Sequence, residues 1–417
     1  MRGRLGVVAS VVTLLLGAGC GAKSGLSEPD AAVDAFVAAE MDAGIPVRCI
    51  EVPPDGGAVV AEFTVPVSLA VVDVFFLIDA TASMVDEIDN VRDGLRGTVV
   101  PGVRASIPDA AFGVALTGEF PVEPYAPRSV RPYEMRSLVT RDVVRVEGAL
   151  DEIPSWGNFD DPEAQVEGLY QVATGEGLGD WISPSFGCPG GGTGGACFRA
   201  ESLPVVVVIT DSQFHNGPGG AFAYEGISPP PHTFDEVVDV LVARGILVIG
   251  LGARDPGRDP AIEHLRAIAE ATGAVDESGR PLAFDIGSRG DGVDDGIVAA
   301  IERLAAGLPL DVDAVVEDVP GDALDARMLI VAVRPLSADP PDAITGIEGD
   351  TFIGVVPGTR VTFEVVVDAS GLPPSDSTRR IAARIIFRAF GRSRVGREDV
   401  MIVIPGVDGD GCMMEGA

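Results

Sequence analysis

The sequence is short of the residues that bind nucleic acids and zinc. Lys23 is the only lysine in 417 residues, and Lys and Arg together number 30 against 63 Asp and Glu, which gives a formal net charge of −33. Such a surface would repel phosphate groups, so we expect no nucleic-acid partner. The 3 histidines and 5 cysteines are too scattered to form the closely spaced ligand set of a zinc site.

The N-terminus has the pattern of an export signal. A basic start, Met1–Arg4, precedes an apolar stretch, Leu5–Leu16, that is too short to span a bilayer as a helix. The following G-A-G-C, ending at Cys20, resembles a bacterial lipoprotein signal, in which the cysteine is lipidated. A cleaved secretory signal that contains a cysteine is the alternative. The resemblance implies a lipid-anchored cell-envelope protein, and Gly21 in place of Asp favours the outer membrane of a Gram-negative bacterium.

Disulfides are permitted in an exported chain. Cys188 and Cys197 bracket a glycine-rich loop, and we expect them to pair with each other. Cys49 and Cys412 lie near the two ends of the part that is expected to fold. A bond between them would hold these ends together, although sequence spacing alone does not fix this pairing.

The composition divides the chain into five segments. Residues 1–20 are the signal, and residues 21–48, which are rich in Ala, Asp and Gly, are predicted to be a flexible tether. Residues 49–70 contain one or two strands, and residues 71–308 alternate strands with helices. Residues 309–417, with alternating strands and Pro/Gly turns, predict an immunoglobulin-like β-sandwich. If the strands of 49–70 join this sandwich, the α/β domain is an insertion in it.

The segment 71–308 predicts a doubly wound, Rossmann-like, mostly parallel α/β sheet. Its expected strands are Val72–Ile78, Ala110–Thr117, Glu134–Val139, Leu203–Thr210, Ile246–Leu251 and Pro281–Asp285. Its expected helices are Pro162–Ala173, Phe234–Ala243, Pro260–Ala271 and Val293–Ala306. In such sheets ligands bind beyond the C-terminal ends of the strands, at the point where the strand order reverses.

Oxygen-bearing side chains follow the first of these strands. Asp79, Thr81 and Ser83 alternate along a tight loop, which turns one carboxylate and two hydroxyls to the same side. These groups suit a hard dication such as Mg²⁺ or Ca²⁺, and they would also suit a helix N-cap. The strand Leu203–Thr210 is likewise followed by a carboxylate, Asp211. If the two strands are neighbours where the strand order reverses, both carboxylates face one ion.

With these features, residues 71–308 resemble the von Willebrand factor A (vWA) domain family, and within it the I-like domain of integrin β subunits. The family's metal-ion-dependent adhesion site (MIDAS) has the pattern Asp-x-Ser-x-Ser, which here is D-A-T-A-S at 79–83, with Thr81 replacing the first Ser. The later aspartate of the family matches Asp211. The glutamate of the integrin segment N-x-D-x-P-E, which also binds the central ion, matches Glu163.

The resemblance implies Mg²⁺ or Mn²⁺ at the central site and Ca²⁺ at flanking sites. The residues that match one flanking Ca²⁺ site are Glu119, Asn158, Asp160 and Pro162, although family members use Asp at the first position. Asp86 and Glu87 match an acidic pair beside a third ion. Without ions, Asn158 and Asp160 would form an Asx-type turn before a helix, and Asp86 and Glu87 would be an acidic helix start.

The resemblance also implies adhesion, in which an Asp or Glu carboxylate of a protein partner completes the coordination of the central ion. An envelope scaffold with a structural metal is the alternative. An enzyme is disfavoured, because the run G-G-G-T-G-G at 190–195 matches a dinucleotide-binding pattern but follows no predicted strand and opens no helix. His215 is expected on a surface loop rather than beside a nucleophile such as Ser212. We therefore predict a non-enzymatic protein.

Overall fold

The computed structural model describes most of the chain between residues 47 and 412. The described residues are 47–68, 71–151, 153–253, 261–276, 278–287, 290, 297–298, 300–301, 303, 309–322, 324–406 and 411–412. The predictions for the signal with Cys20, for residues 21–46 of the tether and for most of the helix Val293–Ala306 lie outside them. Among the described residues, no helix has the length and apolar character needed to cross a membrane.

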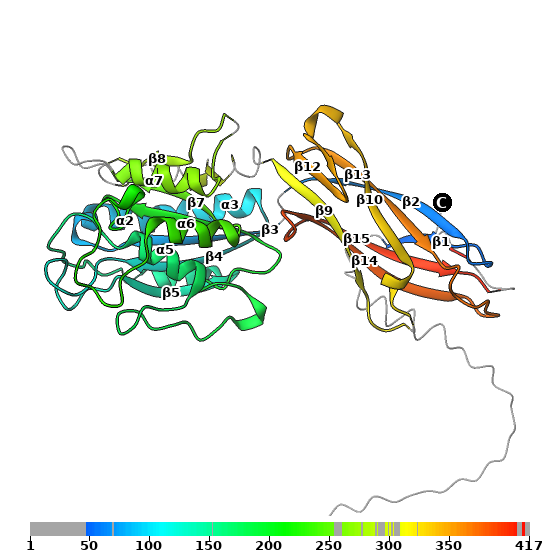
Figure 1. The fold of residues 1–417 in the computed structure, drawn as a ribbon, viewed down its shortest axis with the longest axis horizontal. Coiled ribbons are helices and arrows are strands. Elements are labelled where there is room, and N and C mark those ends of the chain that lie inside the picture. The colour runs from blue at the N-terminus through cyan, green and yellow to red at the C-terminus, as the bar shows by residue number, and fades with distance from the viewer. Residues whose placement is uncertain are drawn as a thin grey trace, which may run out of the picture.

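The α/β part, shown beside the β-strand part in Figure 1, is built on one six-stranded sheet. Its strands are β3 (Val71–Asp79), β4 (Asp109–Thr117), β5 (Tyr133–Thr140), β6 (Leu203–Thr210), β7 (Leu247–Gly252) and β8 (Ala283–Asp285). They lie in the order β5-β4-β3-β6-β7-β8, and within this sheet β5 alone is antiparallel to its neighbour. The predicted α/β class with a mostly parallel sheet is confirmed. The strand order reverses between β3 and β6, and sheets of this kind bind ligands in the crevice beyond the C-terminal ends of the strands at that point.

Helices cover both faces of this sheet (Figure 1). They are α2 (Val85–Gly94), α3 (Val100–Ser106), α4 (Val143–Leu150), α5 (Gln165–Thr174), α6 (Phe234–Ala243) and α7 (Ala261–Ala271), with a π-helical segment η2 (Leu95–Val99) before α3. Successive residues of a strand point to opposite faces. Phe76 and Ile78 of β3 therefore join the core formed with α2, whereas Phe75 and Leu77 join the core formed with α5, α6 and α7.

The β-strand part consists of two sheets. Their strands are β1 (Val47–Glu51), β2 (Ala58–Pro66), β9 (Leu310–Asp318), β10 (Ile330–Asp339), β11 (Gly346–Glu348), β12 (Thr351–Val355), β13 (Arg360–Asp368), β14 (Arg379–Ala389) and β15 (Ser393–Ile404). One sheet has the order β1-β15-β14-β9-β12-β11 and the other β10-β13-β2. Phe363 of β13 packs against Phe352 of β12 and Phe387 of β14, with 5.1 Å between ring centroids in both pairs. The two sheets thus face each other across an aromatic core.

Strands from the two ends of the chain build these sheets together. β1 pairs with β15, and β2 pairs with β13. Because the α/β part lies in the sequence between β2 and β9, it is inserted between strands of the β-strand part. The disulfide Cys49–Cys412 joins β1 to residues that follow β15, with 6.0 Å between the two Cα atoms.

Removing this disulfide is expected to destabilise the β-strand part. We expect Cys49→Ser/Cys412→Ser to lower the free energy of unfolding by about 2–4 kcal/mol, because the crosslink restricts the unfolded chain. Equilibrium urea unfolding followed by circular dichroism measures the change. The matched control is Cys188→Ser/Cys197→Ser, which should cost less, since it opens a sequence separation of 9 residues instead of 363. Equal urea midpoints for the wild type and the Cys49/Cys412 variant would contradict the expectation.

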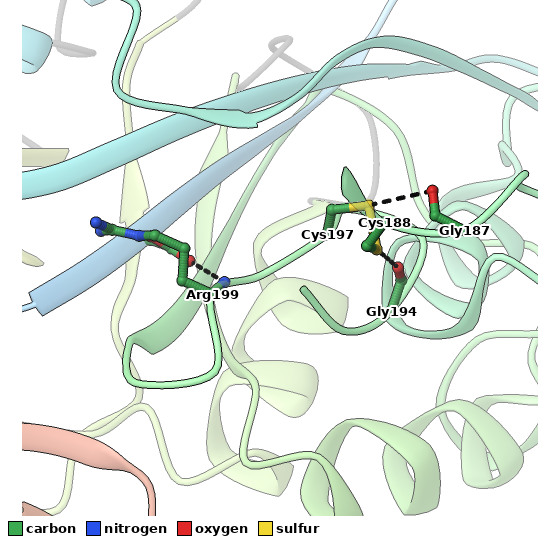
Figure 2. Close-up of a disulfide and its surroundings, with 6 residues drawn as sticks. Gly187, Cys188, Gly194, Cys197 and Arg199 are labelled. Atoms are coloured by element: carbon green, nitrogen blue, oxygen red, sulfur yellow. Dashed lines mark hydrogen bonds and ion pairs between the residues drawn. A yellow bond between two sulfur atoms is a disulfide. The ribbon is translucent and has the colours of Figure 1, made fainter. Parts of the chain in front are cut away.

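The second disulfide, Cys188–Cys197, closes the glycine-rich loop between α5 and β6 (Figure 2). The loop contains one short 3-10 turn, η3 (Pro189–Gly191). Its glycines allow close backbone packing, because a Cβ atom at Gly195 would overlap the carbonyl oxygen of Gln171. The G-G-G-T-G-G run therefore packs against the end of α5.

Arg199, two residues beyond Cys197 (Figure 2), joins the N-terminal ends of three strands. Its Nε donates to Asp73 Oδ1 at 2.7 Å, and its Nη1 donates to Asp109 Oδ1 at 2.6 Å. Asp73 is completely buried, and its Oδ2 also accepts a hydrogen bond from Ser202 Oγ at 2.7 Å. This ion-pair network ties the starts of β3, β4 and β6 together.

The start of β15 contacts the α/β part at the same N-terminal end of these strands. Arg394 N donates to the Glu201 carbonyl at 2.9 Å, and Arg394 Nη1 lies 2.9 Å from Glu201 Oε2. Ser393 Oγ donates to the Ser202 carbonyl at 3.1 Å. The two parts therefore touch at the N-terminal end of β6, opposite the crevice between β3 and β6.

Candidate metal centre

The loop after β3 gathers three oxygen-bearing side chains. Asp79 Oδ1 accepts hydrogen bonds from Thr81 N at 2.9 Å and from Thr81 Oγ1 at 2.7 Å. Ser83 Oγ lies 3.1 Å from Thr81 Oγ1. One carboxylate and two hydroxyls thus lie side by side, as the alternating spacing predicts.

The alternative, that these side chains cap a helix, does not match the structure. Thr81 is the N-cap of the short 3-10 helix η1 (Ala82–Met84), and Met84 is the N-cap of α2, but neither makes a side-chain cap hydrogen bond. The loop backbone is instead held from outside, because Ala82 N donates to the Trp156 carbonyl at 2.7 Å. The hydroxyls are therefore directed into the crevice rather than onto a helix end.

Asp211 meets this loop from the neighbouring strand. β3 and β6 pair in parallel, and Asp79 ends β3 while Asp211 follows β6. Ser83 Oγ donates to Asp211 Oδ1 at 2.9 Å, and Asp211 is buried. The structure therefore brings four of the five predicted central-site residues into one hydrogen-bonded group.

Two residues that the sequence did not point to hold Asp79 in place. Thr210 Oγ1 donates to Asp79 Oδ2 at 2.6 Å, and Gln165 Nε2 donates to the same oxygen at 3.1 Å. Burial, and then the charge of Asp211, raise the pKa of Asp79 to about 7 despite these hydrogen bonds. Gln165 opens α5 and Thr210 ends β6, so only the folded arrangement brings them to this carboxylate.

Glu163, the fifth predicted residue, comes from the loop before α5. Its backbone pairs with the loop after β6: Glu163 N donates to the Gln213 carbonyl at 2.9 Å, and His215 N donates to the Glu163 carbonyl at 2.8 Å. Its side chain is fully buried, and Asn158 Nδ2 donates to Oε1 at 2.6 Å, while Oε2 has no hydrogen-bond partner among the described residues. Burial, and then the charge of Asp79, raise the pKa of Glu163 well above its usual value.

The four residues predicted for the flanking site come from two segments, the loop after β4 with Glu119 and the loop before α5 with Asn158, Asp160 and Pro162. Asn158 Nδ2 also donates to the Asp160 carbonyl at 2.7 Å, and Pro162 is buried in the same loop. Glu119 is fully buried, and its Oε1 accepts a hydrogen bond from Tyr224 at 2.6 Å. Burial raises the pKa of Glu119 well above its usual value, and this effect outweighs the hydrogen bonds from Tyr224 and the Phe120 backbone.

The expectation that His215 lies on a surface loop is wrong. Its side chain is 5 % exposed, and its Nε2 lies 3.0 Å from Asp160 Oδ2. The loop after β6 turns inward because the Glu163 segment pairs with it. Sequence spacing gave no sign of this contact, which joins residues 55 positions apart.

Asp86 and Glu87, the predicted third-ion pair, lie in the first turn of α2. Asp86 is exposed, whereas Glu87 is buried and has Gly290 packed against it. Carboxylates in the first helical turn are favoured by the helix dipole, which accounts for their position without an ion. The third ion stays a prediction.

The donor set of the central group fits a hard dication. Asp79, Asp211 and Glu163 supply carboxylate oxygens, and Thr81 and Ser83 supply hydroxyls, which are the ligand types that Mg²⁺ and Ca²⁺ prefer. Within the part of the chain that the structure describes, the buried Glu163 Oε2 accepts no hydrogen bond. Buried carboxylates repel one another unless a positive charge compensates them, so a cation here would relieve a cost that the chain alone leaves in place.

Comparison with known proteins gives remote similarities. No family model and no curated protein matches the sequence. The pilus adhesin SpaC from Lactobacillus rhamnosus GG in its open conformation has a TM-score of 0.37 and 13% identity, covering 84% of this chain and 45% of the adhesin chain. The VWA domain of SpRpn10 has a TM-score of 0.32 and 11% identity, covering 54% of this chain and 94% of that chain. This chain thus spans about half the length of the adhesin chain, and TM-scores this low assign neither a ligand nor a partner.

Proposed function

We propose that the protein binds Mg²⁺ or Mn²⁺ at the crevice between β3 and β6, and through this ion binds an acidic residue of a protein partner. The observation that carries the proposal is the meeting of two hydroxyls and two carboxylates from separate strand ends. Ser83 Oγ lies 3.1 Å from Thr81 Oγ1 and 2.9 Å from Asp211 Oδ1, so it links the loop after β3 to the carboxylate that follows β6.

The choice of ligands supports recognition of a carboxylate. Thr81 and Ser83 are neutral ligands that add no negative charge to that of the carboxylates, and the bound ion would be able to accept a further oxygen. Hydrogen bonds from Thr210 and Gln165 hold the Asp79 carboxylate in place. In the proposal, an anionic oxygen from outside the chain is this further ligand.

The finer parts of the proposal rest on the sequence. The α/β part would be a vWA domain of the integrin I-like kind, the two-sheet part an immunoglobulin-like sandwich, and Cys20 a lipidated anchor in the cell envelope. The protein would be an adhesion protein and not an enzyme.

Peptide selection tests the partner chemistry. A displayed random-peptide library is passed over the immobilised full-length protein in Mg²⁺, and bound peptides are released with EDTA. We expect the released peptides to share an Asp or Glu. Replacing that residue by Asn or Gln should weaken binding by about 100-fold or more, since losing one partner of a desolvated charged contact costs about 2–5 kcal/mol.

The control is the Asp79→Ala/Asp211→Ala protein, which should retain none of these peptides. Peptides that bind equally well in EDTA, or whose affinity survives the Asn or Gln replacement, would rule out recognition through the ion. A protein that binds Mg²⁺ but selects no acidic peptide would support the alternative of an envelope scaffold with a structural metal.

A further inference from the structure

A second group of metal-ligating side chains lies beside the central one. One ligand atom from each of Glu119, Asp160 and His215 lies within 4.8 Å of the other two. His215 Nε2 is 3.0 Å from Asp160 Oδ2 and 3.5 Å from Glu119 Oε2. Nitrogen and oxygen donors that share one Zn²⁺ at about 2.0–2.2 Å lie about 3.0–3.5 Å apart at the usual bond angles. The three side chains therefore have the spacing of ligands to one ion.

The imidazole of His215 is oriented as a metal ligand. Its Nδ1 lies 2.6 Å from the Phe222 carbonyl oxygen. A carbonyl oxygen only accepts hydrogen bonds, so Nδ1 carries a proton, and the lone pair of the neutral ring is on Nε2. Metal-binding histidines are commonly fixed in this way, by donating their other ring N–H to a backbone carbonyl. A neutral His215 would therefore present its lone pair on Nε2 to the two carboxylates.

Glu119 presents a buried oxygen to the same point. The residue has no exposed surface, and its Oε1 accepts hydrogen bonds from Tyr224 Oη and from Phe120 N. Its Oε2 is also buried but accepts no hydrogen bond from the described residues, and it is directed at His215. A buried carboxylate oxygen without a donor is costly, which points to a positively charged ligand that the protein chain does not supply.

The surroundings hold these ligands rigidly. The Tyr224 ring stacks on His215 with 4.1 Å between centroids, and the Tyr125 ring meets it edge-on at 5.2 Å. Asn216 adopts a left-handed φ of 50° and fixes the loop by accepting a hydrogen bond from Tyr224 N at 3.0 Å. Ligands whose orientation is set by such neighbours bind a metal without reorganising.

We propose that Glu119, Asp160 and His215 form a site for a transition-metal dication, with Zn²⁺ as the representative ion. Imidazole nitrogen suits Zn²⁺ and its neighbours in the first transition row, whereas Ca²⁺ prefers sites made only of oxygen. The site therefore differs in metal class from the flanking Ca²⁺ that the family resemblance implies. Its metal uptake can be measured separately from the ion and the partner of the central group.

The rival explanation is a protonated His215 that neutralises Glu119 and Asp160 without a metal. A protonated imidazole has no lone pair and binds no ion. The two explanations differ in whether the folded protein takes up a nitrogen-ligated metal, and this uptake can be measured directly.

Cobalt binding tests the proposal. Co²⁺ is titrated into the full-length protein in excess Mg²⁺, which occupies the central group, and its visible absorption is recorded. We expect one equivalent of Co²⁺ to bind and Zn²⁺ to displace it, while Ca²⁺ at the same concentration does not. His215→Gln should lower the Co²⁺ affinity by at least about 100-fold, since even residues that only support metal ligands are worth about 10–100-fold.

Two control variants separate this site from others. His232→Gln removes another histidine that is paired with a carboxylate, Glu167, at 2.9 Å, and it should leave Co²⁺ binding unchanged. Asp79→Asn damages the central group alone and should also leave it unchanged, so a failure of the proposed function is distinguishable from a failure of this site.

X-ray absorption of the Zn²⁺-loaded wild type keeps the test valid if His215→Gln does not fold, because it should show one imidazole bound to zinc. The proposal is overturned if the wild type takes up no Co²⁺, if uptake is the same in folded His215→Gln, if Ca²⁺ competes as well as Zn²⁺, or if the bound zinc has no imidazole ligand.

Discussion

Loss of the carboxylates at the ends of β3 and β6 is expected to abolish binding of Mg²⁺ and Mn²⁺ at the central group. We expect Asp79→Ala/Asp211→Ala to lower the affinity for Mg²⁺ by at least about 100-fold, because the change removes two anionic ligands, and lost supporting residues alone cost about 10–100-fold. Isothermal calorimetry of the metal-free full-length protein with Mg²⁺, Mn²⁺ and Ca²⁺ measures the change.

The matched control for this experiment removes two negative charges elsewhere. Glu348 and Asp350 are exposed in the turn between β11 and β12, so Glu348→Ala/Asp350→Ala changes the net charge equally without touching the crevice. Its metal affinity should equal that of the wild type. If both double variants bind Mg²⁺ equally well, or if the wild type binds none at millimolar concentration, the central site does not exist as proposed.

Breaking the ion-pair network of Arg199, at the N-terminal ends of β3, β4 and β6, is expected to have the largest effect on the free energy of unfolding. Arg199→Met keeps much of the side-chain volume but leaves the completely buried Asp73 without its positive partner. Removing one member of a buried ion pair costs about 3–5 kcal/mol, and we expect a loss of this size in the free energy of unfolding. Urea denaturation measures it, with Arg141→Met as the control.

Arg141 also pairs with Asp109, at 2.7 Å, but its side chain is 63% exposed. A pair of this kind contributes about 0–1 kcal/mol, so the control should be nearly neutral. The combined variant Asp73→Asn/Arg199→Met should regain part of the stability, since no unpaired buried charge remains. If Arg199→Met lowers the free energy of unfolding no more than Arg141→Met does, then Arg199 and Asp73 do not behave energetically as a buried ion pair.

The same network makes stability depend on pH. Burial by itself would raise the pKa of Asp109, but hydrogen bonds from Arg141 and Arg199 outweigh it and lower the pKa below the usual 3.8. A depressed folded-state pKa adds stability above the unfolded pKa, and this stability is lost as the pH falls through the folded value. As the pH falls below about 4, the unfolding free energies of the wild type and Arg199→Met should therefore draw closer together, as urea titrations at each pH would measure.

Elements were predicted best from the sequence where a single local pattern was enough to identify them. The apolar runs of β3 and β6 are buried along their whole lengths, and a strand buried on both faces has no alternating polar positions to obscure it. The ends of these strands located Asp79 and Asp211. To predict that these two carboxylates lie together required one further step, the rule that ligands bind where the strand order reverses.

Elements whose stability comes from distant partners are harder to predict from local sequence. β9 carries Asp313, a poor strand former, but Arg388 of β14 donates to it at 2.7 Å across the sheet. α4 is short and valine-rich, and it is supported by the burial of Val146 and by its N-cap Asp142, which accepts a hydrogen bond from Arg145 N at 3.3 Å. The Asp142 cap is a local signal, whereas the ion pair of Asp313 and the burial of Val146 arise only in the folded protein.

The same limit applies to the candidate sites. Glu163 was located because a linear motif carries it, whereas His215 reaches Asp160 through a loop with Asn216 and Phe222 at positive φ. Non-glycine residues adopt such angles where tertiary contacts enforce them. The contact thus depends on the folded loop, and no spacing in the sequence encodes it.

The insertion of the α/β part between β2 and β9 divides mechanical load. A partner that pulls on the crevice between β3 and β6 would transmit tension to the β-strand part along two covalent paths, one entering at β2 and one at β9. β2 is paired with β13, and β9 lies between β12 and β14, so the two paths enter different sheets. Each path would carry only part of the force that a single linker between consecutive domains would bear alone.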